Sequence, residues 1–461
     1  MLASVPLLPE TAPAQGVSRC PINIRRAGTR VERPDPEQAG AIKAFIGGPV
    51  TVTCGDATMT GDSAEWRQVA ETALMIGNVR YQDTTRTLNS NQLTFYGSRD
   101  EVVATGNVRL IRTANRAMLE GPRVSFTRTP FAGARTVATG RPRMTLPATR
   151  GGGAGPETVV DSDVAEFVGE SEASATGNVE MVRGDITAMA ERARFSEAEA
   201  RAVMYDSALI RGQGFDLAGD SIVAGFELGE LRSIHAFEGA TANGEGFRLS
   251  SDQIRARLTA DQVDVIWAFG DGRSLGSSSE FTLAGDSIEF AFRDGVADSV
   301  SAVGTAAAEQ TPAAGRASAA PVADSAAADS IAVDSVAAAV PARSAAGGLA
   351  EPSLGLDPGA SWIAGDTVRA WFEPDPSAPA AAAASDDGAA GNARIKRLRA
   401  VGDARSYFAA VRDTTRSGEA SRNYLLGGTI EIDFEGGEPK QLTGTDAIGV
   451  YLEPAEEGDG G

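Results

Sequence analysis

Apolar and polar residues alternate with a period of two along most of this chain. Between Ile288 and Phe292, and again between Ile430 and Phe434, every second residue is large and apolar. Strict alternation is typical of β-strands that bury one face and leave the other in water. The pattern therefore predicts an all-β protein with few helices. Only two short stretches, 38–45 and 197–203, are candidates for helix.

A seven-residue pattern centred on Gly-Asn-Val recurs within this alternation. Its best copies are Met75–Tyr81, Ala104–Leu110 and Ala175–Met181, and weaker copies surround Gly140, Gly239, Gly304 and Gly402. Successive copies lie about 30 residues apart, which is typical of stacked supersecondary units.

A second signature, Gly-Asp-Ser or Gly-Asp-Thr, interleaves with the first. It occurs at 219–221, 285–287 and 365–367. Glycine, Asn and Asp supply the positive φ that tight turns need. We therefore expect Gly-Asn, Gly-Asp and Asp-Gly pairs to be turns, with Asp271-Gly272, Asp294-Gly295 and Gly436-Gly437 among them. Each unit is then strand, turn, strand, and the strands have about ten residues.

The units predict a division of the chain into four parts. Residues 1–46 form an N-terminal segment, and 47–305 form a first block of units. Residues 306–360 are rich in Ala, Ser and Pro, so they cannot bury enough apolar surface to offset ordering and are expected to be a linker. Residues 361–455 contain further units.

Composition narrows the function. The 461 residues carry 42 basic and 62 acidic side chains, a net charge of −20, which argues against binding nucleic acid through a basic surface. One histidine and two cysteines leave too few ligands for zinc, haem or iron–sulfur sites, so no cofactor and no metal is expected. No apolar run approaches the roughly 20 residues of a membrane-spanning helix.

The start of the chain bears on its compartment. The apolar stretch 2–8 and the sequence Ala12-Pro13-Ala14 fit the end of a signal peptide, although a basic leader is missing. We expect an exported, periplasmic protein. In that compartment Cys20 and Cys54 could form a disulfide. Closing this loop would stabilise the fold by roughly 3–4 kcal/mol. They could equally be two unrelated thiols.

Two motifs invite an interpretation as an enzyme, and both fail. Residues 272–276 match a nucleophile elbow, but 281–283 reads as a strand where the elbow needs a helix. The Gly-Asp-Ser copies resemble the opening of GDSL-type esterases, yet His235 is the only histidine available as a base. No catalytic residue is therefore expected.

Charged clusters give weaker signals. The acidic clusters at 161–163 and 453–459 lack the spacing of a calcium loop and are expected to be solvated. The run from Arg394 to Arg399 is the one basic cluster, and its alternation fits a strand with a basic outer face, which leaves an anionic partner open.

The repeated Ala-Thr-Gly-Asn-Val-Arg-Leu copies, each followed by a strand such as 91–96, resemble the OstA-like family of periplasmic lipopolysaccharide-transport domains. The resemblance is strongest over 56–200. It implies an elongated antiparallel β-jelly roll with an apolar groove for the acyl chains of lipopolysaccharide. It also implies partners: lipopolysaccharide or a related lipid, and other transport proteins joined by edge-strand addition. A homo-oligomer is left open.

On this reading the inward-facing apolar residues line the lipid groove: Leu93, Phe95, Val108, Leu110, Val124, Phe126, Ile222, Phe226, Ile288, Phe290, Phe292, Ile430, Ile432 and Phe434. The alternative is an exported structural or adhesive β-solenoid whose parallel coils enclose a dry core and bind no lipid. Antiparallel pairing and an apolar cleft would favour transport.

Overall fold

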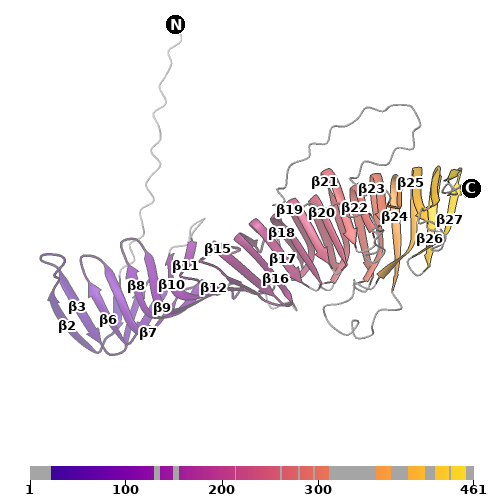
Figure 1. Cartoon of the computed structure of the whole chain (residues 1–461). Helices are drawn as coiled ribbons and strands as arrows, with labels where there is room; N and C mark the ends of the chain where they lie inside the picture. Colours follow the sequence, from indigo (N-terminus) through magenta and orange to yellow (C-terminus); the bar gives the residue numbers. More distant parts are fainter. Residues whose placement is uncertain are drawn as a thin grey trace, which may run out of the picture. The chain divides into compact units, whose positions relative to one another are not determined.

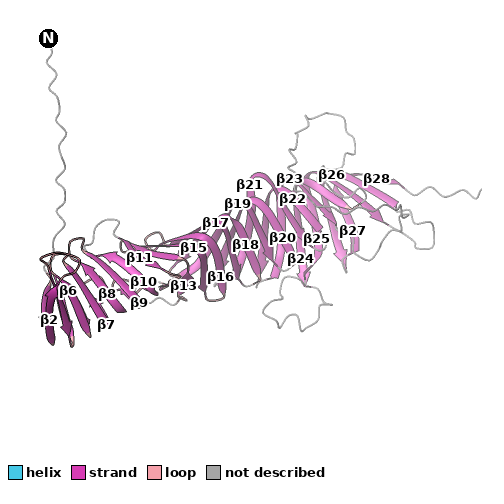
Figure 2. Ribbon diagram, turned by 60° about the vertical axis from the view of Figure 1, so that its left-hand side comes forward, coloured by secondary structure: helices cyan, strands magenta, loops and turns pink. Residues whose placement is uncertain are grey.

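Every regular element that the computed structural model describes is a β-strand (Figure 2). The structure describes residues 22–128, 135–148, 155–310, 360–374, 393–410 and 421–452, apart from 213, 245, 260–261, 279–280, 294–295 and 436–437. The predicted all-β class is confirmed. Both predicted helices are wrong, because 38–45 runs from a turn into β3 and 197–203 runs from a turn into β17. Within the described residues, no helix is long and apolar enough to span a membrane.

The chain divides into two compact units. Unit 1 comprises Met1–Asn243 and Gln253–Asp264, and unit 2 comprises Gly244–Asp252 and Val265–Gly461. The strands before the border are β1 Asn23–Arg26, β2 Thr29–Pro34, β3 Ile42–Gly47, β4 Val50–Cys54, β5 Ala57–Gly61, β6 Ser63–Arg67, β7 Thr72–Gln82, β8 Arg86–Tyr96, β9 Glu101–Arg112, β10 Met118–Thr127, β11 Arg135–Thr139, β12 Arg143–Leu146, β13 Thr158–Asp161, β14 Val164–Val168, β15 Glu172–Arg183, β16 Ile186–Ser196, β17 Arg201–Gly212 and β18 Phe215–Glu227.

Three strands cross the border between the units, namely β19 Glu230–Gly244, β20 Phe247–Thr259 and β21 Gln262–Ser278. The strands that follow in unit 2 are β22 Phe281–Arg293, β23 Val296–Gln310, β24 Trp362–Pro374, β25 Ala393–Ala410, β26 Ser421–Glu435, β27 Glu438–Thr445 and β28 Ile448–Leu452.

The strand pairings that the structure describes are antiparallel. In unit 1, consecutive strands pair with each other from β7 through β10 and from β15 through β18, and in unit 2 they do so from β21 through β27 (Figure 1). This confirms the antiparallel jelly roll, and the alternative of parallel solenoid coils is wrong. Pairing begins before residue 47, since β1 pairs with β4 and β2 with β3.

The Gly-Asn pairs are bulges inside strands, so their prediction as turns is wrong. In the pairing of β7 with β8, Ile76 lies opposite Gln92 and Val79 opposite Ser90, which leaves Gly77 and Asn78 facing a single residue. Both take positive φ values, 76° and 46°. The pairs at 106–107 in β9 and 177–178 in β15 also take positive φ values and face a single residue of the next strand. A bulge bends its strand, so these motifs fold the sheet.

The second signature lies in strands too, and in unit 2 it packs against the first. A Cβ on Gly304 of β23 or on Gly402 of β25 would collide with Asp286 or Asp366 of the preceding strand. In unit 1, Asp62 plays the same part beside Gly77 and accepts a 2.8 Å hydrogen bond from Asn78. Of the other predicted turns, 271–272 lies inside β21, and 294–295 and 436–437 lie outside the described residues.

Gly177 offers a test of this contact between a bulge glycine and an aspartate. A Cβ on Gly177 would meet Asp163 at 2.5 Å, and the backbone φ of Gly177 is 79°. We expect Gly177→Ala to lower the free energy of unfolding by about 2–4 kcal/mol, from left-handed strain and crowding together. Urea unfolding measures it. The matched control is Gly169→Ala, since Gly169 also has positive φ (56°) but open space around its Cβ. An equal cost for both variants would show that the corner contact contributes nothing.

The bulges divide the sheet of unit 1 into two arms that face each other. Where a strand breaks at the corner, its two pieces pair with the two halves of one neighbour; β5 and β6 both pair with β7, and β13 and β14 both pair with β15. Arm A ends at rim A, formed by the turns at 55–56, 83–85, 113–117 and 184–185. Arm B ends at rim B, formed by the turns at 68–71, 97–100, 169–171, 197–200 and 228–229. Inward side chains of the two arms meet, as where the rings of Tyr81 and Phe126 pack edge to face at 5.4 Å.

Candidate functional site: an apolar cavity between the arms of unit 1

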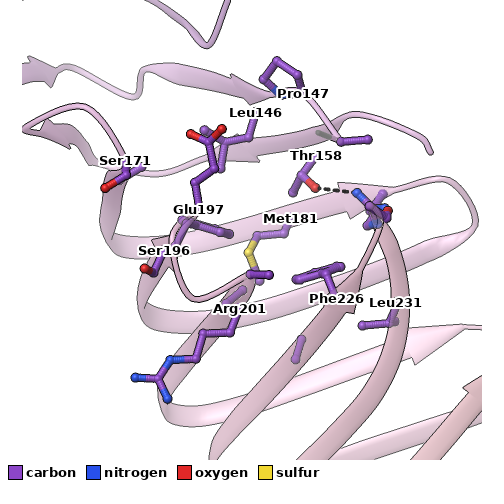
Figure 3. A pocket seen from close by; sticks show the side chains of 18 of the residues that line it. Leu146, Pro147, Thr158, Ser171, Met181, Ser196, Glu197, Arg201, Phe226 and Leu231 are labelled. Carbon is purple, nitrogen blue, oxygen red and sulfur yellow. Dashed lines mark hydrogen bonds between the residues drawn. The ribbon is translucent and has the colours of Figure 1, made fainter. Parts of the chain in front are cut away.

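Unit 1 contains a cavity of about 650 Å³ (Figure 3). Its walls are mostly apolar and come from β15 to β18, the start of β19, and the ends of β12 and β13. Figure 3 shows Met181, Phe226 and Leu231 on this wall, with Glu197 and Arg201 near its border. Such a space suits the apolar part of a ligand, with polar groups limited to the mouth.

The cavity exists because the inward-facing side chains around it are small. This is seen by comparing rows of cross-strand neighbours in two parts of unit 1. On arm B one row of cross-strand neighbours is Ala73, Phe95, Val102, Phe126, and the equivalent row a hundred residues later is Ala173, Phe195, Ala202, Ala224. On arm A the rows are Tyr81, Leu88, Leu110, Leu119 and Met181, Ala188, Ile210, Leu217. The earlier rows fill the space between the arms. In the later rows, alanine replaces Val, Phe and Leu, and space remains.

Three side chains reach from rim A to rim B, and they lie at the border of the cavity. Arg112, at the rim A end of β9, donates a 2.6 Å hydrogen bond to the Gly169 carbonyl on rim B and lies 4.6 Å from the Phe167 ring centroid. Asn115 on rim A donates to Glu197 on rim B at 3.0 Å.

Arg183 makes the third contact, at the rim A end of β15. Its guanidinium donates to the Gly229 carbonyl on rim B and lies 5.0 Å from the Phe226 ring centroid. It also donates to the Thr158 hydroxyl, at the start of β13, at 3.3 Å. All three rim A residues and their rim B partners Glu197, Phe226 and Gly229 line the cavity.

Similar contacts close the filled part of unit 1. Arg86 of rim A lies 4.4 Å from the Phe126 ring centroid and donates to Thr136 at 3.3 Å. Arg128 of rim B donates to the Cys54 carbonyl at 2.8 Å. Beside them, burial and the neighbouring carboxylate of Asp83 raise the pKa of Tyr81, whose hydroxyl donates to that carboxylate at 2.7 Å.

Of the residues predicted to line the groove, Phe226 lines this cavity. Phe292 and Phe434 are half-buried. The others are buried under their neighbours: Leu93, Phe95, Val108, Leu110, Val124, Phe126, Ile222, Ile288, Phe290, Ile430 and Ile432. Their inward direction follows the alternation in the sequence, and their contact with lipid stays a prediction.

The sequence reasoning missed the arginines and the alanines. Arg112 and Arg183 each lie five residues after the Asn of a Gly-Asn motif, at the end of a strand. Ala188, Ala202 and Ala224 stand at inward positions where the earlier repeat has large residues. Both signals are visible once the repeats are aligned by strand register rather than by motif.

The other candidate sites resolve into structural roles. The elbow-like motif lies within β21, and the strand predicted after it is confirmed as β22. The hydroxyl of Ser274, at the centre of the motif, is 2.9 Å from the hydroxyl of Ser251. His235 hydrogen-bonds Gln253 at 3.1 Å and stacks on Phe237, and its burial lowers the pKa of the imidazole.

The charged clusters and the cysteines stand as follows. Arg397 of the basic cluster pairs with Asp433 of β26 at 2.7 Å, so its anionic partner lies within the chain. Asp161 pairs with Arg143, and among the described residues no cluster of His, Cys, Asp and Glu is placed to hold a metal. Cys54 is fully buried and disulfide-bonded. Cys20 lies outside the described residues, as do 453–459, so the pair itself stays a prediction.

Comparison with known proteins gives one family match, and it covers most of the residues that line this cavity. Residues 58–228 match the family described as LptA/(LptD N-terminal domain) LPS transport protein, which supports a lipopolysaccharide-transport domain in this part of the chain. A solved structure of LptH, the LptA-homologous periplasmic component of the lipopolysaccharide transport device of Pseudomonas aeruginosa, is 11% identical over 33% of this chain and 81% of that chain, with a TM-score of 0.19. No curated protein matches.

Proposed function

We propose that this protein is a periplasmic, non-enzymatic carrier that holds the acyl chains of lipopolysaccharide in the cavity of unit 1 and passes the lipid from the inner toward the outer membrane. The observation that carries the proposal is the apolar cavity of about 650 Å³, most of whose lining residues belong to the segment that matches the transport family. Its volume falls within the range of about 300–1,000 Å³ that is usual for ligand sites.

The chemistry of the walls favours the acyl part of the lipid. Each methylene transferred from water into an apolar site contributes about 0.8 kcal/mol, so a chain of moderate length supplies substantial affinity without hydrogen bonds. Charged side chains occur at the rims, where Arg201 and Glu172 reach solvent, and the sugars and phosphates of the lipid would remain outside with them.

Strand addition at the ends of the sheet would join the carrier to other lipopolysaccharide-transport proteins or to further copies of itself. β2 is exposed along its length and pairs on one side with β3. Such an edge offers unpaired backbone groups to a partner strand.

Photo-crosslinking in cells tests the carrier function. A photoreactive residue replaces Phe226, which faces the cavity, or Asp220, which is exposed on the same strand, β18. We expect lipopolysaccharide adducts at position 226 and none at 220. Adducts at neither position, with both proteins folded and exported, would favour a dry β-structural protein instead.

A further inference from the structure

Side-chain contacts hold the two rims of unit 1 together. The backbone hydrogen bonds of the turns instead join neighbouring turns of the same rim. On rim A, the Thr113 amide donates to the Thr85 carbonyl at 2.8 Å, and on rim B the Phe226 amide donates to the Ala200 carbonyl at 2.8 Å. Parting the rims therefore breaks side-chain contacts and leaves the strand ladders intact. A sheet bent at bulges can open in this way as a hinge.

The interior is blocked on the side of the earlier repeat. There the rings of Tyr81 and Phe126 meet between the arms, and Leu88, Leu110 and Leu119 are wholly buried beside them. An acyl chain cannot pass through a close-packed interior without displacing it. The mouth between the rims, at Arg112, Asn115 and Arg183, is the direct way into the cavity.

An apolar residue marks this mouth. Leu228 is 92% exposed in the rim B turn next to Gly229, the residue whose carbonyl Arg183 holds, and both line the cavity. A large apolar side chain so exposed at the border of an apolar cavity gives a lipid chain its first contact.

We propose that lipid loads into unit 1 sideways, between rims A and B, and that Arg112, Asn115 and Arg183 are positioning residues that keep this mouth closed until it does. The proposal rests on the carrier function above. When the rims part, the guanidinium groups and the carbonyls of Gly169 and Gly229 pass to water at the surface, so their hydrogen bonds are replaced rather than lost. The ring of Phe226, which lines the cavity 5.0 Å from the Arg183 guanidinium, then faces the incoming chain.

Locking the rims together tests the proposal. In the purified full chain, Asn115→Cys and Glu197→Cys are joined by a short bismaleimide across the mouth, at a site where the native side chains are 3.0 Å apart. The matched control joins Arg135→Cys to Glu166→Cys, whose native side chains are also 3.0 Å apart but lie on neighbouring strands of arm B. The probe is fluorescently labelled lipopolysaccharide, followed by stopped flow.

We expect the lock to slow loading about tenfold or more and the control crosslink to leave it unchanged, because the open state must be populated before lipid can enter. Arg183→Gln, which retains amide donors but loses the planar cation, should load several-fold faster than wild type. The matched variant Arg211→Gln removes an exposed rim A arginine that pairs with Asp216 in its own hairpin, and it should not change the rate.

The outcomes separate the two proposals. Wild type that binds lipopolysaccharide, with the locked protein loading at the same rate, overturns sideways loading and leaves the carrier function standing. Wild type that binds no lipopolysaccharide at all overturns the carrier function, and sideways loading with it. Slow loading of both the locked protein and its control would show that a crosslink anywhere in unit 1 impedes binding, which also contradicts a specific mouth.

Discussion

Lipopolysaccharide binding should weaken when the cavity of unit 1 is filled with the side chains that fill the earlier repeat. Ala188→Leu and Ala224→Phe, made together, restore the residues found at the equivalent positions Leu88 and Phe126. The new side chains occupy space that the wild type leaves for a ligand, so we expect affinity to fall by a factor of about ten or more while the midpoint of urea unfolding stays the same or rises. Fluorescence titration and urea unfolding measure the two quantities.

The reverse exchange is the control for that experiment. Leu88→Ala and Phe126→Ala, each made alone, open a void in the filled repeat, where both residues are buried. Leu88→Ala should cost about 2–5 kcal/mol of unfolding free energy and Phe126→Ala about 3–5 kcal/mol, and both should leave the cavity at 188 and 224 unchanged. If the filled variant binds lipid as well as wild type does, the cavity is not the site of binding.

The class and the pairing of the fold could be predicted from sequence because strand periodicity is local. An alternation such as that from Ile288 to Phe292 fixes which side chains share a face, and Ile288 and Phe290 are indeed buried. The repeat length and the antiparallel arrangement followed from the same local signals and from the resemblance. Each of these needs only residues that are near one another in the chain.

The bend of the sheet could not be predicted, because one local conformation serves two structures. A Gly-Asn pair with positive φ fits a tight turn and fits a bulge, and strand partners decide between them. Gly77 and Asn78 lie in the middle of β7, where Asp62, in the bend between β5 and β6, packs against them. The two signatures interleave along the chain because of this contact. The contact itself can be recognised only once the pairing of the strands is known.

The cavity and the rim contacts depend on residues far apart in sequence. Alternation places Phe226 and Ile222 on one face, yet Phe226 lines a cavity and Ile222 is fully packed, since the difference lies in the small residues of adjacent strands. Arg183 and Gly229 are 46 residues apart and meet only after the sheet folds at its corner. An inward pattern therefore predicts burial, whereas the space left between two arms depends on the sum of side-chain volumes.

Loss of an arginine should lower the unfolding free energy far more in the filled repeat than at the cavity, and Arg128 is the arginine to test. Arg128 donates to Asp100 at 2.8 Å, and the two side chains are only 12% and 3% exposed. Arg128→Ala removes the guanidinium from a buried carboxylate and also breaks the bond to the Cys54 carbonyl on the opposite rim. We expect a loss of about 3–5 kcal/mol of unfolding free energy, measured by urea unfolding, because a buried carboxylate without its cation is poorly solvated.

Two further variants separate burial of charge from loss of a contact. Adding Asp100→Asn to Arg128→Ala neutralises the carboxylate and should recover part of the loss, since asparagine tolerates the left-handed backbone at this position, where φ is 52°. Arg192→Ala breaks the exposed pair with Asp206 and should leave the unfolding midpoint unchanged. If Arg128→Ala proves as mild as Arg192→Ala, water reaches Asp100, and the rims of the filled repeat are then as ready to part as those of the cavity.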